Sequence, residues 1–201
     1  MTRLTLLRHG RPEVDPRAPA AGWRLSPDAV LDLKALRRSG VLPSGAAWWS
    51  SPEPKARATA SALSDSPVRL VEDLREQERP AEWFDDASEF TRLVRLSVME
   101  PDVAARRGWE PAGHTQARVV AAVRRVVAEA AGTELVLVGH GTAWTLAVAA
   151  LTGQPPDLAA WLGMAMPDHC TIDIDTDTDL DSGQVVSGWG AWRDRLPGAR
   201  D

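Results

Sequence analysis

The sequence has little of what secreted and membrane proteins require. It contains a single cysteine, Cys170, so no disulfide can form within the chain. The apolar run near its start, Leu4–Leu7, is shorter than the roughly 7 to 15 apolar residues of a secretory signal. The longest mostly apolar stretch, Ala143–Leu151, is far shorter than the roughly 20 residues of a membrane span. We therefore expect a cytoplasmic protein that makes no membrane contact.

Charge and composition narrow the class further. The 201 residues are 44% hydrophobic and 25% charged, which excludes a disordered or collagen-like chain. A net charge of -5 argues against a nucleic-acid partner, because such proteins normally carry a basic surface. We expect residues 1–201 to form one domain, and the composition leaves open whether it is a monomer or a homodimer. Lysine is scarce, so Lys34 and Lys55 both merit attention.

Short apolar runs alternate with stretches of helical periodicity, which predicts an α/β protein. The expected strands cover residues 4–8, 46–50, 68–71, 135–139, 170–174 and 184–187. The expected helices cover residues 28–38, 54–63, 88–98, 115–131, 142–152 and a short segment near 158. We predict a three-layer sandwich, in which a mainly parallel sheet has helices on both faces. Ser26, which precedes Pro27, is expected to cap the first helix.

Residues 77–113 form the least regular part of the sequence. We expect a variable lid or substrate-selecting region there, because irregular insertions commonly carry specificity. Trp83 and Trp109 either line an apolar pocket in this region or anchor its loops. Arg106 and Arg107 either form a solvated face or contact a distal anion of the substrate.

Two of the predicted strands end in a His-Gly pair. His9 and Gly10 follow the first strand, and His140 and Gly141 follow the fourth. Ligands of α/β sheets bind at the carboxyl ends of strands, where glycine permits close approach and the following helix offers free N–H groups. With Arg8 beside the first histidine, this matched placement predicts an anion site.

Four motifs in this order resemble those of the histidine phosphatase superfamily, also called phosphoglycerate mutase-like: LLRHG, SSPEPKARATA, LRE and VGHG. The resemblance covers nearly the whole chain. It implies that His9 is the nucleophile, that Arg8 and His140 surround the phosphate, and that Glu76 is the general acid. Glu78 competes for the acid role, because two carboxylates two residues apart in a loop can exchange places. The family chemistry requires no cofactor and no metal.

The second motif departs from the usual form of the family. Lys55 stands at the position of the family's phosphate-binding arginine, as in a branch of the family with a Glu-Pro-Lys-Ala form. Lysine lacks the bidentate fork of arginine, but it retains the positive charge. We favour Lys55 as the working substitute. Arg57 is the alternative, although residues two apart do not share a helix face.

The resemblance implies a phosphomonoesterase that acts through a phosphohistidine intermediate on a small phosphorylated metabolite. One alternative is a phosphoglycerate mutase-type phosphotransferase, and another is a non-catalytic module that binds a phosphorylated ligand. The mutase is disfavoured because Pro12 and Asp15 stand where the family often has Thr and Asn. The alternating acids of residues 173–181 lack the Gly and Glu of a calcium loop, so we expect a solvated hairpin there.

Overall fold

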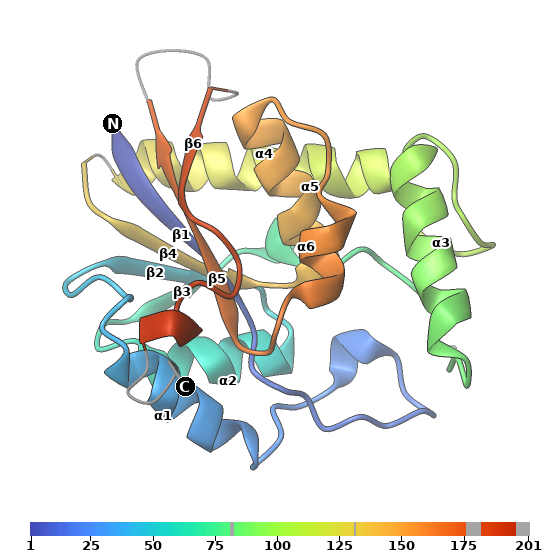
Figure 1. Ribbon diagram of the computed structural model, residues 1–201, viewed down its shortest axis with the longest axis horizontal. Helices are drawn as coiled ribbons and strands as arrows, with labels where there is room; N and C mark the ends of the chain where they lie inside the picture. Colours follow the sequence, from blue (N-terminus) through green and yellow to red (C-terminus); the bar gives the residue numbers. More distant parts are fainter. Residues whose placement is uncertain (81–82, 131, 176–181, 196–201) are drawn as a thin grey trace.

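The computed structural model describes residues 1–80, 83–130, 132–175 and 182–195, which form a six-stranded sheet with helices on both faces (Figure 1). The strands are β1 (Thr2–Arg8), β2 (Ala47–Ser50), β3 (Val68–Leu70), β4 (Leu135–Gly139), β5 (Asp168–Ile174) and β6 (Gln184–Ser187). The α-helices are α1 (Ala29–Arg38), α2 (Pro54–Leu63), α3 (Ala87–Met99), α4 (Ala112–Ala130), α5 (Gly141–Thr152) and α6 (Leu158–Gly163). Short 3₁₀ helices are η1 (Ala20–Gly22), η2 (Glu72–Leu74) and η3 (Arg193–Arg195).

The sheet is mixed, with the strand order β3-β2-β4-β1-β5-β6. The four strands β1 to β4 run parallel to their neighbours in the β3-β2-β4-β1 part of the sheet. β5 pairs with β1 in the antiparallel sense, and β6 pairs with β5 in the same sense. The predicted α/β sandwich is confirmed, and its parallel part ends at β1.

Two helical layers bury opposite faces of the sheet. On one face, α1 and α2 pack in a cluster that includes Val136 and Val138. On the other face, α4 and α5 pack in a cluster that includes Leu135 and Leu137. These four residues alternate along β4, because successive side chains of a strand point to opposite faces. A continuously apolar strand therefore sits at the centre of the sandwich.

The carboxyl ends of β1, β2 and β4 meet at one edge of the sheet. The parallel register places Arg8 opposite Gly139. The backbone N–H of His9 donates to the Gly139 carbonyl at 3.0 Å, and that of Ser51 donates to the Val138 carbonyl at 2.9 Å. These bonds extend the ladder by one residue and set the residues that follow the strands side by side.

Three elements begin and end at the predicted residues: β4 (135–139), β6 (184–187) and α2 (54–63). The other predicted elements differ from the structure by up to three residues at an end. The prediction that Ser26 caps the first helix is wrong, because the cap position is Asp28. Ser26 instead accepts a hydrogen bond from the Asp28 N–H at 3.3 Å, in a turn that precedes the helix. Residues 176–181 of the predicted hairpin, and residue 131 of the predicted fourth helix, lie outside the described residues.

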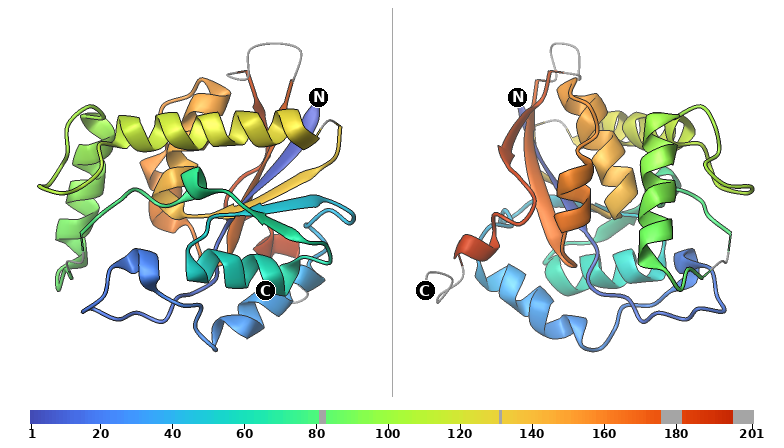
Figure 2. Two further views of the ribbon diagram at one scale, coloured as in Figure 1. Left: turned by 180° about the vertical axis from the view of Figure 1, so that it is seen from behind. Right: turned by 45° about the vertical axis from the view of Figure 1, so that its right-hand side comes forward.

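Residues 83–113 contain α3, which stands beside the sandwich and not on the sheet (Figure 2). An aromatic cluster holds this region in place: Phe84, Phe90 and Trp109 pack together, and Phe90 also contacts Trp161 of α6. Trp109 is buried and therefore anchors the loop.

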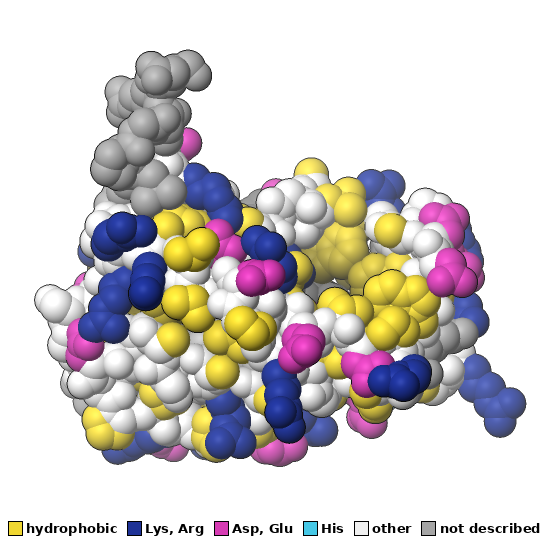
Figure 3. All heavy atoms as spheres, turned by 90° about the horizontal axis from the view of Figure 1, so that it is seen from below, with side chains coloured by type: hydrophobic (Ala, Val, Ile, Leu, Met, Phe, Trp, Pro, Cys, Tyr) yellow, Lys and Arg dark blue, Asp and Glu magenta, His cyan; other side chains and the backbone are white. Residues whose placement is uncertain are grey.

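Trp83 is 47% exposed, and its ring lies 6.5 Å from that of Trp23 in the segment between β1 and α1. The two irregular segments of the chain therefore meet through a pair of tryptophans. In the view from below the molecule, hydrophobic side chains gather on the right-hand side, which is the side of α3 (Figure 3).

Candidate active site

His9 and His140 come together at the carboxyl edge of the sheet. Their ring centroids lie 5.2 Å apart with an angle of 63° between the ring planes. Both side chains are buried. Two residues 131 positions apart in the sequence thus share one site, because β1 and β4 are adjacent parallel strands.

The hydrogen bond of His9 defines its tautomer. The Nδ1 atom lies 2.7 Å from the backbone carbonyl oxygen of Gly10. A carbonyl oxygen can only accept, so Nδ1 carries the proton and donates it to this bond. The lone pair of the neutral ring is therefore on Nε2, which is the atom available for attack.

His140 occupies the cap position before α5. Its Nε2 lies 2.9 Å from the Ser51 hydroxyl oxygen and 3.4 Å from the Glu53 Oε1. Its Nδ1 is buried and has no hydrogen-bond partner among the described residues. This ring therefore has a polar atom that a ligand of the site can satisfy.

The electrostatic surroundings favour the neutral form of both rings. Burial, together with the charges of Lys55 and Arg8, lowers the pKa of His140 well below 6.5. Burial also lowers the pKa of His9 well below 6.5, and the positive charges of Lys55 and Arg8 add to this effect. A neutral His9 suits nucleophilic attack. His140 is likewise disfavoured as a cation in the absence of an anion, because the same cations that attract an anion also repel a proton.

Arg8 and the two glycines shape the anion side of the site. The partly buried Arg8 guanidinium donates from Nη1 to the Met164 carbonyl, and its Nε has no partner among the described residues. A Cβ atom at Gly141 would lie 3.3 Å from the Arg8 Nε, so the glycine allows the guanidinium to approach α5. A Cβ at Gly10 would lie 2.9 Å from a Leu25 methyl group. Both glycines therefore permit a close approach that a larger residue would disturb.

The two candidate cations of the second motif lie on different faces of α2. Lys55 is 4% exposed, and its charge contributes to lowering the pKa of both histidines, so it lies beside them. Arg57 is exposed. The Lys55 Nζ donates to the Glu53 carboxylate and, at 2.7 Å, to the Ala20 carbonyl. Of these two cations, Lys55 is the buried one, and it is paired with the Glu53 carboxylate.

Glu76 lies at the N-terminus of α5. Its carboxylate accepts hydrogen bonds from the N–H groups of Thr142 at 3.0 Å, Ala143 at 2.8 Å and Gln77 at 2.9 Å. Burial raises its pKa, but the charge of Arg79 and these amides outweigh that effect and lower it overall. Glu78 is exposed. The structure therefore places the first of the two candidate acids against the site.

Two charged residues near the histidines were missed in the sequence. Glu53 is buried within the second motif, and no role was assigned to it from the sequence. Arg79 lies over the rings of Phe90 at 5.0 Å and Trp109 at 4.7 Å, and it donates to the Thr142 hydroxyl at 2.9 Å. The sequence could have indicated Arg79 by its position three residues after Glu76. Its contacts with Phe90 and Trp109 could not be predicted, because these residues are remote in the sequence.

Glu110 and Arg118 form a clamp beneath the acid. Arg118 binds both carboxylate oxygens of Glu110, at 2.8 Å from Nε and 2.7 Å from Nη2. The same guanidinium donates to the backbone carbonyls of Asp73, Arg75 and Glu76 at 2.8 to 2.9 Å. One ion pair therefore fixes the backbone that carries Glu76.

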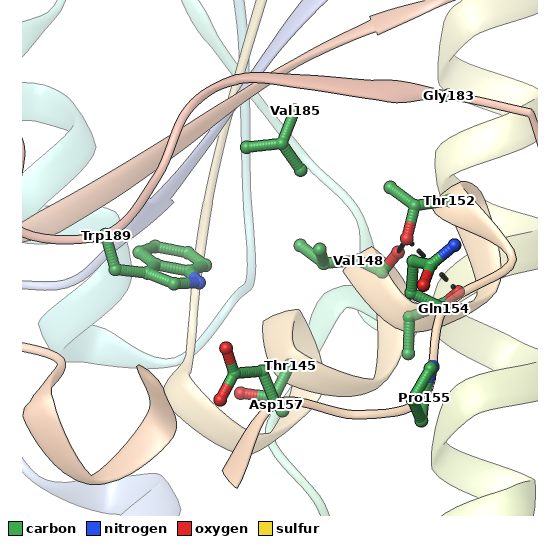
Figure 4. A pocket seen from close by; sticks show the side chains of 10 residues that line it. Thr145, Val148, Thr152, Gln154, Pro155, Asp157, Gly183, Val185 and Trp189 are labelled. Carbon is green, nitrogen blue, oxygen red and sulfur yellow. Dashed lines mark hydrogen bonds between the residues drawn. The ribbon is translucent and has the colours of Figure 1, made fainter. Parts of the chain in front are cut away.

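A cavity of about 300 Å³ lies elsewhere, between α5, the residues that follow it, and β6 (Figure 4). Its lining includes Val148, Val185 and Trp189, and none of the site residues above. Within the described residues, no group of three or more His, Cys, Asp or Glu side chains is arranged to hold a metal ion. In the same part of the chain, no helix has the length and apolar character to cross a membrane.

An α/β sheet with paired histidines and flanking cations at its carboxyl edge is suited to bind an anion such as a phosphoryl group. The sequence profile of the histidine phosphatase superfamily (branch 1) matches residues 4–181. The chain belongs to this family and is an enzyme of the phosphatase class. A comparison with curated proteins finds no match.

Solved structures share the fold over nearly the whole chain. YhfR of Bacillus stearothermophilus is similar at 22% identity, with a TM-score of 0.72 and coverage of 92% of this chain and 96% of that one. A mycobacterial glucosyl-3-phosphoglycerate phosphatase is similar at 24% identity, with a TM-score of 0.72 and coverage of 94% and 99%. A phosphoserine phosphatase from Entamoeba histolytica, in complex with phosphoserine, has 16% identity, a TM-score of 0.71 and coverage of 96% and 98%. The TM-scores and coverages show that the fold is shared.

Proposed function

We propose that the protein is a phosphomonoesterase that acts on a small phosphorylated metabolite through a phosphohistidine at His9. The observation that carries the proposal is the pair of buried rings of His9 and His140, 5.2 Å apart, with Arg8 and Lys55 beside them. A phosphomonoester resists anionic nucleophiles because it carries close to two negative charges. A neutral imidazole flanked by cations avoids that repulsion.

In the first half of the proposed reaction, the His9 Nε2 lone pair attacks phosphorus in line with the ester oxygen. The N–P bond forms, the P–O bond to the leaving group breaks, and the alkoxide takes a proton from Glu76. Arg8 and Lys55 offset the charge of the equatorial oxygens. A phosphoryl dianion also raises the pKa of His140, and this attraction makes the ring a further donor to the phosphoryl group.

In the second half, water attacks phosphorus and the N–P bond breaks. Glu76 takes the proton from water, a role that suits a carboxylate whose amide hydrogen bonds lower its pKa. The first half requires a proton on this carboxyl, and the substrate dianion favours the protonated form by repulsion, against the effect of the amides. The same residue therefore serves as acid and then as base.

The test compares His9→Ala with His114→Ala, a matched control at an exposed histidine. Release of p-nitrophenol from p-nitrophenyl phosphate and acid-labile labelling of the protein are measured for both, with circular dichroism to confirm folding. His9→Ala should lose turnover and labelling, and the control should keep both. Normal turnover by His9→Ala would refute the proposal, and tight phosphate binding without turnover by the unaltered protein would favour the non-catalytic module.

The substrate is sought in a panel of phosphorylated metabolites, with His9→Ala as the control. Phosphoserine and glucosyl-3-phosphoglycerate belong in the panel, because proteins of similar structure act on or bind them. Transfer of the phosphoryl group to a second metabolite, in place of release as inorganic phosphate, would favour the mutase alternative.

A further inference from the structure

Glu53 places a buried carboxylate inside the phosphate site. It is 5% exposed, although carboxylates are rarely buried without a partner. Its Oε1 accepts a hydrogen bond from the Glu76 N–H at 2.9 Å and lies 3.4 Å from the His140 Nε2. Its Oε2 accepts a hydrogen bond from the Lys55 Nζ. The Glu53 carboxylate thus links Lys55 to His140 and to the backbone of Glu76.

The helix that follows does not require this carboxylate. Glu53 stands at the cap position of α2, but its side chain makes no capping hydrogen bond there. Its backbone carbonyl receives the N–H groups of Ala56 and Arg57 at 3.0 Å, and any residue supplies that carbonyl. Burial of a carboxylate is costly, so its place beside the histidines requires a reason other than helix formation.

The ion pair with Glu53 engages Lys55, the cation on which phosphate binding depends in the proposed function. An ammonium group has three donors, and two of those of Lys55 are directed to Glu53 and to the Ala20 carbonyl. A phosphate dianion must compete with the carboxylate for Lys55 and also meets the repulsion of the carboxylate itself. Both effects lower the affinity of the site for phosphate.

We propose that Glu53 is a turnover-determining residue of the phosphate site: by holding Lys55 in an ion pair, it weakens the binding of inorganic phosphate and promotes its release. The inference rests on the proposed phosphatase function, in which inorganic phosphate is the product. Glu53 acts through Lys55 and is thus a positioning residue.

The test is Glu53→Gln, which preserves the shape of the side chain. One amide atom still accepts from the Glu76 N–H, but the other becomes an NH₂ group that cannot accept from Lys55. We expect the dissociation constant for inorganic phosphate, measured by calorimetry, to fall about tenfold. Product inhibition of p-nitrophenyl phosphate hydrolysis by phosphate and by orthovanadate should strengthen by the same factor, and kcat should fall.

Two comparisons make the result specific. In the Lys55→Ala background, Glu53→Gln should tighten phosphate binding much less, because only the relief of direct repulsion remains when the lysine is absent. Glu129→Gln, at an exposed position of α4, should leave phosphate binding unchanged. A folded Glu53→Gln protein whose phosphate affinity is unchanged or weaker would overturn the inference, because that is the result for a purely structural carboxylate.

If Glu53→Gln does not fold, Glu53→Asp provides the test. The shorter side chain retains the charge but places it farther from Lys55. Phosphate should therefore bind more tightly than to the unaltered protein, by a smaller factor than for Glu53→Gln. Unchanged phosphate binding would overturn the inference. Calorimetry needs no turnover, so the outcome is separate from that for His9. If the unaltered protein hydrolyses the substrate but substitution of Glu53 does not change phosphate affinity, only the inference about Glu53 is refuted. If the unaltered protein shows neither hydrolysis nor labelling, the proposed function is refuted.

Discussion

The clamp between Glu110 and Arg118 should stabilise both the fold and the loop that carries the acid. Glu110 accepts two charge-assisted hydrogen bonds from Arg118 and one from the Glu78 N–H at 3.0 Å. Although burial raises it, the hydrogen bonds from Arg118 lower the pKa of Glu110 from 4.5 to about 2. The perturbation is Glu110→Gln, which removes the charge and one of the acceptor oxygens while keeping the size.

The magnitude follows from that pKa. The difference between 4.5 and about 2 corresponds to about 3 kcal/mol of stability, at roughly 1.4 kcal/mol for each factor of ten in proton affinity. Solvent screening at this partly exposed pair reduces the expected loss to about 2 kcal/mol. Because the folded-state pKa lies below the unfolded value, the contribution is complete above about pH 4.5 and is lost as the pH falls towards 2.

The assay is urea unfolding of both proteins from pH 7 down to pH 3, with Glu129→Gln as the control. The exposed Glu129 carboxylate lies 4.0 Å from Arg69, so its loss should cost under about 0.5 kcal/mol. The difference in unfolding free energy between Glu110→Gln and the unaltered protein should narrow below pH 4.5. The kcat of the variant should fall, because Arg118 is held less firmly and so fixes the backbone of Glu76 less well. A cost within about 0.5 kcal/mol of the control at pH 7 would refute the reasoning.

Two further predictions concern the site itself. Lys55→Ala should weaken phosphate binding, measured by calorimetry, about tenfold. Arg57→Ala, at an exposed position, should change it less than about twofold. Equal small losses for the two variants would show that the lysine is the wrong residue. Because burial lowers the pKa of His9, its ring stays neutral below pH 6.5, so the acidic limb of the kcat/KM profile for p-nitrophenyl phosphate, corrected for substrate ionisation, should lie well below that pH. A limb at pH 6.5 or above would contradict the burial of the nucleophile.

The sequence alone determined the strands, the helices and the edge of the sheet where the site lies. The apolar run of β4 and the His-Gly pairs after β1 and β4 are local patterns, and parallel strands bring their carboxyl ends to a common edge. Local periodicity and the order of the motifs were therefore sufficient to predict the sandwich and to select His9 and His140.

Only the tertiary structure decided how charge is arranged around those rings. That Lys55 is held by Glu53 and that Glu76 rests on the amides of α5 depend on side-chain contacts between segments remote in sequence. The same is true of the lowered pKa of His140. Burial and the number of cations around a ring set this pKa, and neither is encoded by the neighbours of the ring in the chain. Sequence patterns report which residues share a local element, whereas a pKa depends on every charge within a few ångströms, whatever its place in the chain.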